Sequence, residues 1–104
     1  MFLNGGKWEG KQIVSSEWIK DSVTPHMALG PNTKYGLKWW LYGYGPDNKL
    51  VAWSGNGFGG QQPFVLPEHD IVAVYTAWNI KQGPTLTFRE AMNRLAALVT
   101  DAKK

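Results

Sequence analysis

The segment QPFVLPEHDIVAVYTAW, residues 62–78, determines the expected fold. Residues 62–66 and 71–78 are rich in β-branched and aromatic side chains, which favour strands. The residues between them, Pro67 to Asp70, read Pro-Glu-His-Asp and are typical of a turn. Because so short a connection joins antiparallel neighbours, the segment predicts a β-hairpin. The unbroken apolar run from Ile71 predicts that the second strand is buried on both faces.

Two segments further upstream predict more strands of the same sheet. Tyr35–Tyr42 is aromatic and partly alternating, and Lys49–Trp53 follows it after a Pro-Asp-Asn turn within residues 43–48. Residues 26–32 contain a glycine and a proline and are expected to form a loop.

Helices are predicted before and after these strands. Residues 16–23 suit a short helix with Ser15 or Ser16 as its N-cap. Thr87 and Glu90 have the spacing of a capping box at the start of a C-terminal helix. An apolar stripe at helical spacing follows and comprises Phe88, Met92, Leu95, Leu98 and Val99. The fold class is therefore α+β, an antiparallel sheet of three to four strands with a C-terminal amphipathic helix packed on it.

Length and composition narrow the classes of function. The 104 residues suit a single domain, 1–104. The net charge of +3 is dispersed rather than gathered in a basic run, which argues against nucleic acid as a partner. The chain has no cysteine, so disulfides and thiolate chemistry are excluded. The two histidines, His26 and His69, lie far apart in sequence, and neither a metal nor a cofactor is expected. No apolar run is long enough for a membrane span.

The glycine-rich stretch 55–60, GNGFGG, is the strongest candidate site. It matches G-x-G-x-x-G, but a strand rather than a helix is expected after it, which argues against dinucleotide binding. A tight turn would need only one or two of the four glycines. The remaining reading is a backbone that approaches a ligand and offers N–H groups to an anion or oxyanion. The preceding Ser54 does not stand in G-x-S-x-G, and no serine is followed by lysine at Ser-x-x-Lys spacing.

Six tryptophans raise a second possibility, a platform on which sugar rings stack. In a small domain such side chains are more often part of the core, and this is the expectation for Trp39, Trp40 and Trp78. Trp53, beside the glycine-rich stretch, suits either role. A small non-catalytic module that binds a sugar or peptide through Trp53 and Phe58 therefore stays open.

The stretch from Trp53 to Val74, WSGNGFGGQQPFVLPEHDIVAV, resembles the C-terminal part of the serine β-lactamase-related hydrolases. This superfamily includes class C β-lactamases, penicillin-binding-protein-like esterases and 6-aminohexanoate-dimer hydrolases. Upstream segments are similar to the family in the family's order, so the resemblance covers nearly the whole chain. They are FLNGGKW (2–8), GKQIVS (10–15), Glu17-Trp18 and YGLKWW (35–40).

The resemblance implies roles for the glycine-rich stretch. Gly55-Asn56-Gly57 is similar to the third family motif, whose strand lines the active site, although Gly55 stands where Lys or His is common. The N–H after the motif glycine is one of two oxyanion donors in the family, which implies the Phe58 N–H here. A frame two residues earlier, Trp53-Ser54-Gly55, also fits, and Trp53 and Ser54 are possible substrate contacts.

The resemblance also implies what the chain does not supply. The family's nucleophile and base stand in Ser-x-x-Lys, a spacing absent from this sequence. The apolar pair Phe2-Leu3 before Gly5-Gly6 reads as the last turn of a helix, as though that helix began before Met1. We therefore expect the C-terminal portion of a larger hydrolase of esters or amides, inactive alone. Exposed sheet surface would favour self-association. Its cellular location is left open.

Overall fold

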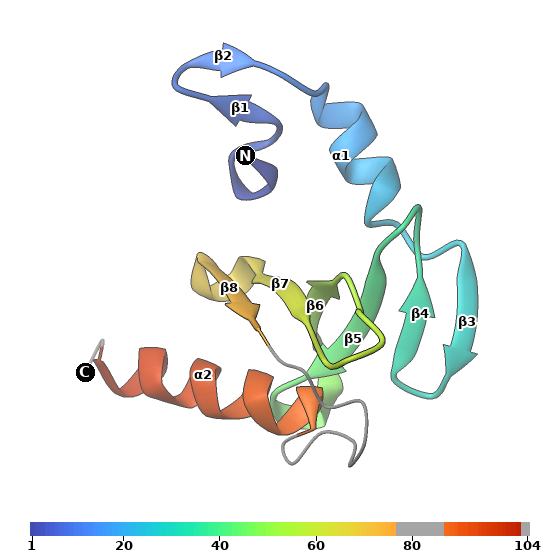
Figure 1. Cartoon of the computed structure of the whole chain (residues 1–104), viewed down its shortest axis with the longest axis vertical. Helices are drawn as coiled ribbons and strands as arrows, with labels where there is room; N and C mark the ends of the chain where they lie inside the picture. Colours follow the sequence, from blue (N-terminus) through green and yellow to red (C-terminus); the bar gives the residue numbers. More distant parts are fainter. Residues whose placement is uncertain (77–86, 103–104) are drawn as a thin grey trace.

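The computed structural model describes residues 1–76 and 87–102, apart from the side chain of Val99. The fold is α+β, with a six-stranded antiparallel sheet, a separate two-stranded hairpin and a C-terminal helix (Figure 1). The large sheet is a meander, because each strand pairs with the next along the chain in the order β3-β4-β5-β6-β7-β8. The elements are β1 (Lys7–Trp8), β2 (Lys11–Gln12), α1 (Ser16–Ser22), β3 (Met27–Gly30), β4 (Thr33–Tyr35), β5 (Trp40–Tyr44), β6 (Leu50–Ser54), β7 (Gln62–Leu66), β8 (Ile71–Tyr75) and α2 (Phe88–Ala102).

The core lies between the sheet and α2, which Figure 1 shows along one side of the strands. Met92 of α2 is fully buried, and Phe88 and Leu95 pack around it as their spacing predicts. The sheet's buried contribution alternates along the strands and consists of Tyr44, Ala52, Phe64 and Leu66. The predicted helix is confirmed, while Trp78 and the side chain of Val99 lie outside the described residues.

The predicted capping box of α2 is present. The Glu90 carboxylate accepts hydrogen bonds from the Thr87 N–H at 2.9 Å and from the Thr87 hydroxyl at 2.7 Å. The Glu90 N–H in turn donates to the Thr87 hydroxyl oxygen at 3.3 Å. The hydrogen bonds from Thr87 lower the pKa of Glu90 below its ordinary value.

Helix α1 follows its predicted boundaries closely, whereas the β1–β2 hairpin was not predicted. Ser15 is the N-cap of α1, because its hydroxyl accepts a hydrogen bond from the Trp18 N–H at 3.1 Å. Phe2–Asn4 form one turn of 3₁₀ helix, and Gly5 ends it with φ 58°. The β1–β2 hairpin and α1 lie on the side of the large sheet away from α2 (Figure 1).

The number of strands exceeds the predicted three to four, for two reasons. Residues 26–32, expected as a loop, contain β3, which pairs with β4 at the edge of the sheet. The expected single strand 35–42 is divided between β4 and β5, since Lys38 has φ 67° and the chain reverses there. Strand propensity alone did not reveal that reversal. The β7–β8 hairpin is confirmed, with Phe64 opposite Ala73.

The prediction that the last strand is buried on both faces is wrong. β8 is an edge strand of the described sheet, and α2 covers only one of its faces. Val72 and Val74 point away from the core and are 62% and 64% exposed. An apolar run therefore marked a strand correctly but did not report how many layers cover it.

Candidate functional site

The glycine-rich stretch forms the connection between β6 and β7, at one end of the sheet. The last ladder pairs before it are Trp53 with Val65 and Ser54 with Phe64. The Gly55 N–H then donates to the Pro63 carbonyl at 3.0 Å, which extends the ladder by one bond. Residues 55–61, which we call the glycine loop, thus leave a firmly paired sheet.

Hydrogen bonds within the glycine loop fix its backbone. The Gly57 N–H donates to the Gln61 carbonyl at 2.7 Å, and the Gly60 N–H donates to the Gly57 carbonyl at 3.1 Å. The Gln61 side chain folds back, and its amide oxygen accepts from the Gly59 N–H at 3.1 Å. Three of the backbone donors are therefore used inside the loop.

This arrangement explains why the loop needs several glycines. A Cβ atom at Gly57 would lie 2.6 Å from the Gln61 amide oxygen, and one at Gly59 would lie 2.6 Å from the Gln61 amide nitrogen. Gly60 has φ 90°, a conformation that side chains disfavour. The close approach of Gln61, which sequence reasoning missed, accounts for glycines that a simple turn would not require.

Phe58, at the tip of the glycine loop, is the residue to which the resemblance assigns an oxyanion donor. Its side chain is 94% exposed. Among the described residues, no acceptor is hydrogen-bonded to the Phe58 N–H. The same holds for the N–H of Asn56, the residue after the motif glycine in the earlier frame. In either frame, the backbone N–H that follows the motif glycine makes no hydrogen bond within the glycine loop.

Asn56 holds the start of the glycine loop against the sheet. Its amide oxygen accepts from the Ser54 hydroxyl at 2.9 Å, and its amide nitrogen donates to the Tyr42 hydroxyl at 2.6 Å. Ser54 is fully buried, so its hydroxyl orients Asn56 rather than facing solvent. Sequence reasoning missed Tyr42. Its alternation with Trp40 and Tyr44 along β5 is the signal that places the three side chains on the same face of the sheet.

The tryptophans divide between the sheet and the surface. Trp53 is half-buried on the face away from α2, between its register partners Leu41 and Val65. Trp40 is half-buried and stacks on Tyr42, with ring centroids 6.1 Å apart. Trp39 is also half-buried, whereas two tryptophans of the N-terminal part, Trp8 and Trp18, are exposed.

The other polar candidates serve the fold. The Ser22 hydroxyl donates to the Ile19 carbonyl at 2.8 Å, and Ser15 caps α1. His26 contacts Asp21 at 3.3 Å on the surface. Within residues 1–76 and 87–102, no three His, Cys, Asp or Glu side chains gather in a way that could hold a metal ion.

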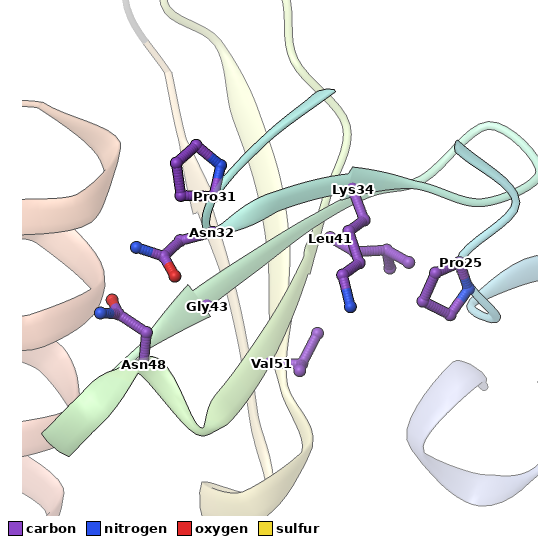
Figure 2. Close-up of a pocket in the computed structure, with 8 residues that line it drawn as sticks. All are labelled: Pro25, Pro31, Asn32, Lys34, Leu41, Gly43, Asn48 and Val51. Carbon is purple, nitrogen blue, oxygen red and sulfur yellow. The ribbon is translucent and has the colours of Figure 1, made fainter. Parts of the chain in front are cut away.

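A small hollow of about 130 Å³ lies between the β3–β4 turn and β5–β6 (Figure 2). Its polar lining comes from Asn32, Lys34 and Asn48, and its apolar lining from Leu41, Val51 and two prolines. Figure 2 shows the amides of Asn32 and Asn48 on one side of Gly43 and the Lys34 side chain farther along, toward Pro25. None of these groups is a nucleophile or a general base poised for catalysis.

None of the helices described in this chain has the length and apolar character needed to cross a membrane. In comparisons with known proteins, no family model matches the sequence, and no curated protein matches it either. The glycine loop and its supporting side chains are therefore the basis for a functional assignment.

Proposed function

We propose that this chain is the C-terminal portion of a serine β-lactamase-related hydrolase and that it contributes one wall and one oxyanion donor to the active site. The observation that carries the proposal is the Phe58 N–H, a backbone donor at the tip of the glycine loop that no described residue accepts. In the earlier frame the Asn56 N–H has the same property. The family-like order of segments from Phe2 to Val74 supports the proposal.

The parent reaction would be hydrolysis of an ester or amide through an acyl-serine. Attack on the carbonyl carbon places negative charge on its oxygen, and a fixed N–H with no acceptor inside the loop would stabilise that charge without reorganisation. The Gly57 and Gly60 hydrogen bonds would hold the donor in place, and Asn56 would anchor the loop to β5. The nucleophile and its base, in Ser-x-x-Lys, would come from another part of the enzyme.

Hydrolysis assays with the purified chain test this assignment. Because no serine stands at Ser-x-x-Lys spacing, we expect no turnover of nitrocefin or of a chromogenic ester above the buffer rate. Protein-dependent turnover that survives further purification would contradict the proposal. If turnover is seen, the Ser54→Ala variant shows whether the one serine beside the glycine loop is its source; Ser54 is buried and orients Asn56.

The second candidate is a non-catalytic module that binds a sugar or peptide. The observation in its favour is that Phe58, at the tip of the glycine loop, is 94% exposed. Trp53 lies on β6, shortly before the loop begins. A titration with oligosaccharides and peptides, read by tryptophan fluorescence, separates the two candidates. Saturable binding that Phe58→Ala abolishes would favour the module, and its absence would favour the hydrolase wall.

A further inference from the structure

A second hollow adjoins the glycine loop, and no role has yet been assigned to it. It encloses about 340 Å³ and is lined by three aromatic rings, those of Phe2, Trp18 and Trp39. Gly55 and Pro63 also line it, so it reaches the point where the glycine loop leaves the sheet. We propose that this hollow, which we call the aromatic groove, binds a small aromatic carboxylate.

The rings of the aromatic groove suit a flat apolar group. Phe2 and Trp39 form an edge-to-face pair with centroids 4.9 Å apart, so their positions are mutually fixed. Trp18 projects from α1 and is 52% exposed, which leaves indole surface available to a ligand. An aromatic ring that enters the groove would bury this surface and stack against it, which is favourable beyond the area removed from water.

Charge defines the other end of the ligand. Lys38 is the one charged residue among the described residues that line the aromatic groove, and no Asp or Glu lines it. The two ion pairs of the described chain join His26 to Asp21 and Lys49 to Asp47, so neither uses Lys38. An unpaired ammonium beside an apolar surface attracts an anion and repels a cation. This is the charge complementarity that selects a carboxylate.

The backbone at Lys38 supports a use for its side chain. Lys38 has φ 67°, a left-handed conformation that glycine and asparagine adopt far more readily than lysine. The turn that holds it is closed by the Gly36 N–H, which donates to the Trp39 carbonyl at 2.9 Å. Glycine at position 38 would form the same turn without strain. A strained lysine at the groove therefore fits a binding role better than a purely structural one.

The inference does not depend on the proposed hydrolase function, because it concerns binding alone. If the chain proves to have no relation to serine hydrolases, the aromatic groove keeps its rings and its cation. If the groove fails to bind, the Phe58 N–H and its test are unaffected.

Isothermal titration calorimetry of the full chain with phenylacetate tests the proposal, with phenylacetamide as the neutral control. We expect saturable binding of phenylacetate at one site and roughly threefold weaker binding of phenylacetamide, as for an exposed charge contact. The Lys38→Gln variant should remove this preference while it keeps the weaker binding of the amide. Lys11→Gln, on β2 and outside the groove, should leave the preference unchanged.

Tryptophan variants test the aromatic part. Trp18→Ala should weaken phenylacetate binding about tenfold. The matched control is Trp8→Ala, which removes an indole that is 60% exposed and does not line the groove, and should change affinity less than about twofold. Circular dichroism spectra identify any variant that fails to fold, in which case Lys38→Gln decides alone. No saturable binding, equal affinity for acid and amide, or equal loss in Trp8→Ala and Trp18→Ala would overturn the proposal.

Discussion

The Asn56 amide nitrogen lies 2.6 Å from the Tyr42 hydroxyl oxygen and donates a hydrogen bond that ties the glycine loop to β5. The two residues are fourteen positions apart in the chain, and β6 lies between them in the sequence. The Ser54 hydroxyl completes the arrangement by donating to the Asn56 amide oxygen at 2.9 Å. The loop that carries the free Phe58 N–H is thus anchored by side chains as well as by its own backbone.

Removing this anchor should weaken the fold by a measurable amount. Asn56→Ala is expected to lower the free energy of unfolding by about 1 kcal/mol, the usual value of a hydrogen bond of this kind. In the double variant with Tyr42→Phe, the loss should be smaller than the sum of the two single losses, since each substitution removes the same Asn56–Tyr42 hydrogen bond. Urea denaturation measures each value. Additive losses would show that the Asn56–Tyr42 bond contributes nothing.

A matched control uses Asn4, an exposed residue whose side chain makes no hydrogen bond among the described residues. Asn4→Ala should change the free energy of unfolding by less than about 0.5 kcal/mol. A loss in Asn4→Ala equal to that in Asn56→Ala would remove the significance of the first result.

The close approach of Gln61 makes Gly57 intolerant of a side chain. In Gly57→Ala the new Cβ would meet the Gln61 carbonyl oxygen at 2.9 Å as well as its amide oxygen, so the loop must shift. We expect a loss of about 1–3 kcal/mol in the free energy of unfolding, as for other overpacked sites. Gly30→Ala is the control, because nothing lies within 4 Å of its Cβ position. Equal midpoints of thermal unfolding in the two variants would refute this account of the loop.

Tyr44 should make the fold sensitive to alkaline pH. Burial, with a smaller contribution from the Glu68 carboxylate, raises the pKa of Tyr44 from 10.0 to about 12. The unfolded chain then releases the proton near pH 10 while the folded chain still holds it, so stability present below pH 10 is lost between pH 10 and about 12. Urea denaturation across this range should show a shallower loss for Tyr44→Phe than for the wild type.

The same variant should cost little at neutral pH. The Tyr44 hydroxyl is buried and has no hydrogen-bond partner among the described residues, so phenylalanine removes an unsatisfied polar group. A free energy of unfolding within about 0.5 kcal/mol of wild type, or above it, is expected at pH 7. A large loss at pH 7, or an unchanged slope above pH 10, would contradict this view of Tyr44.

The outer face of β8 should promote self-association. Val72 and Val74 are exposed on one face at the edge of the described sheet, and no charged residue interrupts the strand. Sedimentation velocity should show an apparent mass that rises with protein concentration. A Val72→Lys and Val74→Lys double variant should sediment as a monomer. A wild-type chain that stays monomeric at every concentration would refute the expectation.

The sequence predicted the elements whose signals are local and missed those that depend on partners. The Thr87–Glu90 capping box and the Ser15 cap were predictable because short side-chain contacts determine them. β3 was missed because its residues form a strand only beside β4. The exposure of Val72 could not be predicted, since an apolar run is the same whether one layer or two cover it.

The candidate site shows the same division. The run of glycines identified the loop, but the Gln61 side chain that requires Gly57 and Gly59 becomes apparent only in three dimensions. Tyr42 was not a candidate in the sequence. It reaches the glycine loop only through the register of β5 against β6. Register depends on pairing along both strands, and no single residue type reports it.

An amide NMR titration of the ¹⁵N-labelled chain with methylphosphonate, a tetrahedral oxyanion analogue, tests the central claim most directly. If the glycine loop presents a free donor to an oxyanion, the Phe58 amide proton, or that of Asn56 in the earlier frame, should shift downfield with saturation. The Gly57 and Gly60 amide protons, already hydrogen-bonded inside the loop, should move far less. Shifts confined to residues outside the glycine loop, or no saturable shift at Phe58 and Asn56, would contradict the account.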